Sequence, residues 1–70
     1  MIDKEVIETL AYMAASRRRL AAVARRDYDG LRGIKLDAVM ELENAYLLAL
    51  QTYIAAVAHN AREEAESIPQ

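Results

Sequence analysis

Two long stretches in which apolar residues recur with helical spacing make up almost the whole chain. In the first, they fall at intervals of three or four residues, which places them in one stripe along an α-helix. The stripe consists of Val6, Leu10, Met13, Arg17, Leu20, Ala24 and Tyr28. We expect the Asp3 carboxylate to cap the first turn and Gly30 to follow the last turn in a left-handed conformation. The first stretch therefore predicts a helix over about residues 4–28.

The second stretch runs without a helix breaker from Asp37, which we expect to be its N-cap, to Pro69. It predicts a helix over about residues 38–66, after a connection over about residues 29–37. We expect three apolar residues of this connection to cap the end of the core: Leu31, Ile34 and Leu36. Two long helices joined by so short a loop fold back on each other. The chain, residues 1–70, is thus predicted to be one all-α domain, an antiparallel two-helix hairpin.

Apolar residues cover about half of the circumference of the second helix, in two adjacent ridges. The first ridge is Leu42, Tyr46, Leu50, Tyr53, Val57 and Ala61, and the second is Met40, Leu47, Ile54, Ala58 and Ala65. A helix covered by one neighbour needs a stripe of only about 100°. Since exposed apolar strips are rare on monomers, we expect a homodimer that forms a four-helix bundle. A higher-order bundle and a monomer that shelters the strip on another protein are the alternatives.

The interface of this dimer is predicted to consist of Leu42, Tyr46, Leu47, Leu50, Tyr53, Ile54 and Val57. Alanines on or beside the inward faces would let the helices approach closely: Ala14, Ala21, Ala24, Ala49, Ala56 and Ala58. Alanine is also the best helix former, so its abundance has a second explanation.

The net charge of −2 conceals a separation of charge along the chain. Residues 1–16 carry −2, residues 17–35 carry +5 and residues 36–70 carry −5. The chain has no cysteine, which excludes a disulfide framework and a thiolate metal site and fits a cytoplasmic protein. The N-terminus lacks a basic region followed by an apolar run, so we expect no signal peptide. The most apolar window, Ala45 to Ala58, is shorter than the about 20 residues that span a bilayer.

Two charged residues fall inside apolar faces. Arg17 interrupts the stripe of the first helix, and Glu43 lies in the apolar arc of the second. In a hairpin folded about residues 32 and 33, Arg17 lies opposite about Leu48, close enough for its long side chain to reach Glu43. We expect an Arg17–Glu43 ion pair, within one hairpin or across the dimer, that fixes register. The alternative is that Arg17 lays its methylene groups on the core and sends its guanidinium to water.

Positively charged residues gather near the loop. The predicted partner-binding residues are Arg18, Arg19, Arg25, Arg26, Tyr28 and Arg32. Such a surface can contact phosphates of a nucleic acid or an acidic protein, or it can be a solvated face neutralised by nearby carboxylates. The sequence pI of about 5.3 favours a protein partner over a nucleic acid.

Candidates for catalysis and metal binding are few. His59 is the one histidine, and the Glu-x-x-His motif of di-iron bundles is absent because position 56 is alanine. We expect His59 to form a surface ion pair with Glu63, and no metal or cofactor to be bound. No serine or threonine has a histidine near it, and there is no glycine-rich phosphate loop. We therefore expect a protein that is not an enzyme and has no small-molecule substrate.

In length and helix count the chain resembles the Rop-type antiparallel hairpin dimers, which act on pairs of RNA molecules. Short all-α chains without a catalytic set also look like phage-encoded inhibitors, including anti-CRISPR proteins. We expect a non-enzymatic protein that binds and regulates or inhibits a macromolecular partner. The alternatives are a Rop-like RNA-binding or DNA-binding dimer and a purely structural oligomerisation module.

Overall fold

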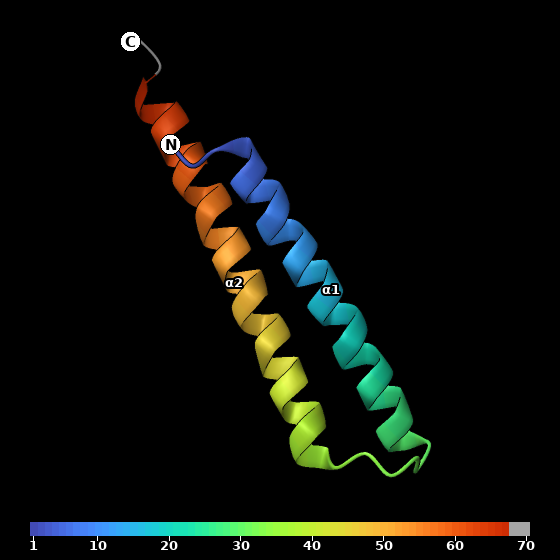
Figure 1. The fold of residues 1–70 in the computed structure, drawn as a ribbon. Helices are drawn as coiled ribbons and strands as arrows, with labels where there is room; N and C mark the ends of the chain where they lie inside the picture. The colour runs from blue at the N-terminus through green and yellow to red at the C-terminus, as the bar shows by residue number, and fades with distance from the viewer. Residues whose placement is uncertain (68–70) are drawn as a thin grey trace.

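The computed structural model describes residues 1–67 and consists of two helices, α1 (Lys4–Asp29) and α2 (Leu36–Ser67). They lie side by side in opposite directions along a rod 59 Å long, joined at one end by a short loop (Figure 1). The predicted all-α antiparallel hairpin is confirmed. α2 begins two residues earlier than predicted and α1 ends one residue later. Pro69, the predicted helix stop, lies outside the described residues.

The helices meet along two rows of side chains with alternating three- and four-residue spacing. On α1 the row is Ile7, Leu10, Ala14, Arg17, Ala21, Ala24 and Tyr28, and on α2 it is Val39, Leu42, Tyr46, Ala49, Tyr53, Ala56, Asn60 and Glu63. Every member is buried or half-buried. This is the seven-residue repeat of a coiled coil. We call these two rows the seam.

The fully buried residues of the seam are almost all small. Ala14, Ala21 and Ala24 of α1 and Ala49 and Ala56 of α2 are each at most 6% exposed. Their short side chains allow the two backbones to approach closely, as the sequence suggested. The one larger side chain that is completely buried is Val39, near the loop end of α2.

The predicted stripe of α1 differs from the observed seam at three positions. Val6 and Leu20, which the sequence placed in the stripe, are 47% and 59% exposed. The positions that follow them, Ile7 and Ala21, lie in the seam instead. Leu10, Arg17, Ala24 and Tyr28 belong to both rows, so the prediction is wrong only at three positions, each displaced by one residue and therefore by about 100° of rotation.

The end of α1 differs from the prediction in which residue takes the left-handed conformation. Gly30 has a φ of −83°, and Leu31, with a φ of 57°, takes the left-handed position. The Leu31 amide donates to the Tyr28 carbonyl at 3.0 Å and the Arg32 amide to the Asp27 carbonyl at 2.9 Å. These two bonds define a Schellman ending, in which the left-handed residue is most often glycine. Leu31 is 90% exposed, so the prediction that it caps the core is wrong.

The other predicted caps are also only partly correct. Asp3 is the N-cap of α1, but its side chain makes no capping hydrogen bond, and its carbonyl accepts from the Ile7 amide at 3.1 Å. Asp37 is not an N-cap, because it lies inside the first turn of α2. The Lys35 carbonyl accepts the first amide bonds of that helix, from Ala38 at 3.1 Å and from Val39 at 3.2 Å.

Much of the apolar surface of α2 stays outside the seam, as its wide apolar arc predicted. Met40, Leu47 and Ile54 of the second predicted ridge are 50%, 49% and 56% exposed. Of the seven predicted interface residues, Leu42, Tyr46 and Tyr53 belong to the seam against α1. The remaining ones are half-buried or exposed: Leu47, Leu50, Ile54 and Val57. One neighbouring helix therefore leaves an apolar strip on α2 that Glu43 interrupts.

Candidate functional site

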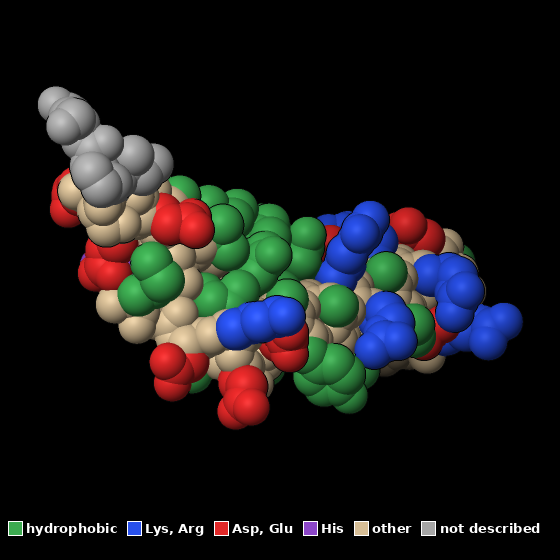
Figure 2. Space-filling model, turned by 90° about the horizontal axis from the view of Figure 1, so that it is seen from above, with side chains coloured by type: hydrophobic (Ala, Val, Ile, Leu, Met, Phe, Trp, Pro, Cys, Tyr) green, Lys and Arg blue, Asp and Glu red, His purple; other side chains and the backbone are tan. Residues whose placement is uncertain are grey.

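Charge is segregated between the two ends of the rod (Figure 2). Lysine and arginine side chains gather at the loop end, acidic side chains gather at the opposite end, and hydrophobic side chains fill the middle of the face in view. The hairpin fold causes this, because it brings the basic central part of the sequence to one end and both acidic termini to the other.

Glu43 binds Arg25, and the predicted Arg17–Glu43 ion pair is wrong in the hairpin. Arg25 donates from Nε to Glu43 Oε2 at 3.0 Å and from a terminal nitrogen to Oε1 at 2.7 Å. This two-pronged contact lowers the pKa of the Glu43 carboxyl and raises that of Arg25, chiefly through the hydrogen bonds between the two side chains. The guanidinium also lies 5.9 Å from the centre of the Tyr28 ring.

Arg17 lies at the position along the rod that the sequence predicted, but its side chain lies in a different groove from Glu43. It is half-buried in a shallow groove with Met13, Leu48 and Thr52, and so stands beside Leu48. Glu43 lies in a different groove, with Arg25. The position along the rod was predicted correctly, and the face was not.

The predicted partner-binding arginines extend from the middle of α1 to the loop and do not form one flat patch. Arg18 and Arg26 share a groove with the Arg25–Glu43 pair, whereas Arg19 lines a groove on another side with Leu20 and Val23. Arg26 also meets Arg32, beside the last turn of α1. Arg25 is held by Glu43, and Tyr28 is half-buried. Of the predicted partner-binding arginines, the exposed ones are Arg18, Arg19, Arg26 and Arg32.

Leu31 joins these arginines at the tip of the loop. It is the most exposed large hydrophobic residue of the described chain, at 90%. Its left-handed backbone is unfavourable for a leucine by about 1–2 kcal/mol. The only signal for this exposed position in the sequence is an apolar residue between Gly30 and Gly33, a pattern that equally predicts a residue covering the end of the core.

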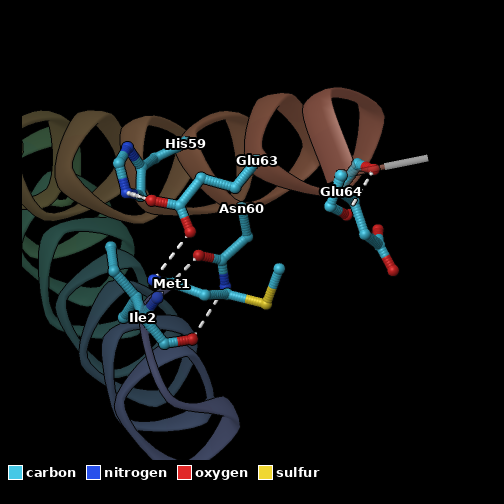
Figure 3. Close-up of polar contacts among 7 residues, drawn as sticks. Met1, Ile2, His59, Asn60, Glu63 and Glu64 are labelled. Carbon is cyan, nitrogen blue, oxygen red and sulfur yellow. Dashed lines mark hydrogen bonds and ion pairs between the residues drawn. The ribbon is translucent and has the colours of Figure 1, made fainter. Parts of the chain in front are cut away.

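The opposite end of the rod is tied together by polar contacts (Figure 3). The Asn60 side chain accepts from the Ile2 amide and donates to the Ile2 carbonyl, both at 2.8 Å. Glu63 accepts from the amine of Met1 at 2.6 Å and from His59 at 2.8 Å. The hydrogen bond from the N-terminal amine, more than the neighbouring His59, lowers the pKa of the Glu63 carboxyl. The predicted His59–Glu63 pair is confirmed.

The side chains of residues 1–67 include no group of three or more His, Cys, Asp or Glu residues placed to hold a metal ion. Within the same residues, neither helix combines the length and apolar character needed to cross a membrane. Comparisons with family models, with curated proteins and with solved structures gave no match. The function therefore has to be inferred from the residues and their geometry.

Proposed function

We propose that this protein is a non-enzymatic binding protein that regulates or inhibits a larger protein, and that it contacts an acidic surface of that partner through its loop end. The observation that carries the proposal is the combination at this end of exposed Arg26 and Arg32 with the exposed Leu31, with exposed Arg19 further along α1. Arginine is enriched at protein interfaces, where apolar contacts form the dry centre and charges the rim.

Leu31 favours a protein partner over a nucleic acid. Its side chain offers no hydrogen bond to a phosphate, but it can fill a small apolar pocket. Its backbone geometry also holds it away from the hairpin, which is consistent with a contact made outside the molecule. Binding of RNA or DNA by the same arginines is the second candidate function, favoured by the gathering of basic side chains at one end.

The homodimer is the second part of the proposal. The exposed apolar strip on α2, with Leu47 at 49% and Ile54 at 56%, supports it, because soluble monomers rarely leave such a strip uncovered. A purely structural oligomerisation module would share this strip but would not need the arginines.

Charge reversal at the loop end tests the contact. We would compare the wild-type chain with Arg26→Glu/Arg32→Glu and with the control Arg62→Glu, an exposed arginine at the far end of α2. Each would be used to capture proteins from cells of the native host and to shift mixed RNA and DNA in a gel at about 50 mM salt. A captured protein that is lost with the loop-end variant and kept with the control supports the proposal.

Three results would count against it. Binding of RNA or DNA that is lost with the loop-end variant would replace the protein partner by a nucleic acid. Identical capture by all three chains would remove the arginines from the contact, and full biological activity of the loop-end variant would favour the structural module.

A further inference from the structure

The side of the hairpin that carries Arg25 and Glu43 has a second coiled-coil row on α2. Its six large apolar members are Leu36, Met40, Leu47, Leu50, Ile54 and Val57, and Glu43 occupies the one charged position among them. From Met40 onward each member follows a seam residue by one position, and Leu36 extends the row by one step at its start, so this row keeps the three- and four-residue spacing and is rotated from the seam by about 100°. We call it the second row.

A rotation of about 100° is close to the right angle between the two neighbours of a helix at the corner of a square four-helix bundle. α1 occupies the first of these neighbouring positions. From this geometry we infer that a second copy of the chain occupies the other, with the two α2 helices antiparallel and their second rows in contact. The inference rests on the homodimer of the proposed function and assigns its face and orientation.

A two-fold axis through the middle of the second row makes the row complementary to itself. With the axis between Leu47 and Leu50, Leu47 faces the partner's Leu50, Met40 faces the partner's Val57, and Glu43, which Arg25 holds, faces the partner's Ile54. Leu36 then faces the partner's Ala61. The large residues near the centre of the row would be buried by one another, with a small residue at its end.

α1 supports the same axis independently. The groove that holds Met13 and Arg17 beside Leu48 and Thr52 puts α1 residues 16–17 level with α2 residues 48–49, where the axis passes. On the Arg25 side of α1, the axis then brings together four pairs: Lys4 with the partner's Asp29, Glu8 with the partner's Arg25, Ala11 with the partner's Ala22, and Ala15 with the partner's Arg18. The first two pairs join opposite charges, the third joins two alanines that let the helices approach, and the fourth lays the Arg18 side chain over an alanine.

The charge of the whole rod also favours the antiparallel orientation. Residues 17–43, at the loop end, carry seven Lys and Arg against five Asp and Glu, and the remaining described residues carry two against six. Antiparallel rods place the basic end of each chain against the acidic end of the other, whereas parallel rods place like charges together. In this register the partner's Glu64 lies near Lys35. Arg19, which lines a groove on another side of α1, remains outside the contact, and Arg26 lies at its edge near the loop.

Sedimentation of two matched variants tests the face. Leu47→Glu places a charge in the second row, and Leu20→Glu places the same charge at a residue that is 59% exposed on another side of the hairpin. We expect Leu47→Glu to weaken the dimer at least roughly a hundredfold, since the two-fold axis buries the charge twice, and Leu20→Glu to leave it unchanged. Ile54→Glu, 56% exposed, repeats the test, with circular dichroism reporting helicity.

Cross-linking tests the orientation, because the chain has no cysteine of its own. In a mixture of Lys35→Cys and Glu64→Cys chains, we expect disulfides between the two variants and few between identical ones. Lys35→Cys chains that link to one another would overturn the antiparallel arrangement. If Leu20→Glu dissociates the dimer and Leu47→Glu does not, the proposed face is wrong but the homodimer stands. If the wild-type chain is monomeric at high micromolar concentration, the homodimer itself is wrong.

Discussion

Truncation of Val39 is the sharpest test of how the hairpin is held together. Val39 is 0% exposed and is the one large side chain that the seam buries completely. Val39→Ala removes two methyl groups, each contributing about 0.8 kcal/mol of transfer free energy, and leaves a cavity that adds to the cost. Alanine returns about 0.5 kcal/mol through its higher helix propensity. We expect a net loss of about 2 kcal/mol in the free energy of unfolding.

Such a loss is large for this chain, because small domains are stable by about 0.05–0.15 kcal/mol per residue. It corresponds to a fall in Tm of about 8–16 °C. The matched control is Val23→Ala on α1, where the valine is 45% exposed and the same propensity gain offsets most of the loss. Both variants would be unfolded in urea and by heat at one protein concentration, followed by far-UV circular dichroism. Equal shifts for the two variants would refute the role of Val39 as the anchor of the seam.

Three further predictions concern single contacts. Asn60→Ala removes both hydrogen bonds to the N-terminal segment and should cost about 1–2 kcal/mol in urea unfolding, whereas Asn60→Asp keeps the acceptor and should cost less. The pKa of the Glu43 carboxyl is lower in the folded than in the unfolded chain. Its contribution to stability is therefore present above about pH 4.3 and is lost as the pH falls through the lowered pKa. An acid titration of the Tm should show this loss in the wild type and a smaller loss in Glu43→Gln. Leu31→Gly should raise the free energy of unfolding by about 1 kcal/mol because it relieves a φ of 57°, while Gly33→Ala should lower it by a similar amount because Gly33 has a φ of 81°. A lower Tm for Leu31→Gly or a higher Tm for Gly33→Ala in thermal melts would contradict the backbone argument.

The fold could be predicted from the sequence because its signals are long and repeated. Two uninterrupted helical patterns joined by one short, glycine-containing loop predict an antiparallel hairpin. The position of Arg17 beside Leu48 follows from counting residues away from the loop along each helix. The His59–Glu63 pair was predictable for the same reason, since residues four apart on a helix are neighbours.

Rotation of the helices and the contacts of irregular backbone could not be predicted in the same way. An error of one residue turns a helix by about 100°, and the large residues Val6 and Leu20 outweighed the alanines that the close packing requires. The side of the hairpin on which Glu43 lies was missed in a similar way, so it was paired with Arg17 rather than with Arg25. The Asn60–Ile2 contact depends on the path of backbone outside the helices, on which a periodic pattern carries no information.

The chain connects the two helices of the hairpin only at the loop end, so contacts further from the loop close longer segments of chain. The Arg25–Glu43 contact spans 18 residues of chain, and the Ile2–Asn60 contact spans 58. Because closing a longer loop costs more conformational entropy, contacts form outward from the turn and separate first at the termini. Backbone amides near the loop should therefore exchange their protons with solvent more slowly than those near the termini. The arginine-bearing end is thus the part of the molecule that keeps its shape longest while the other end frays.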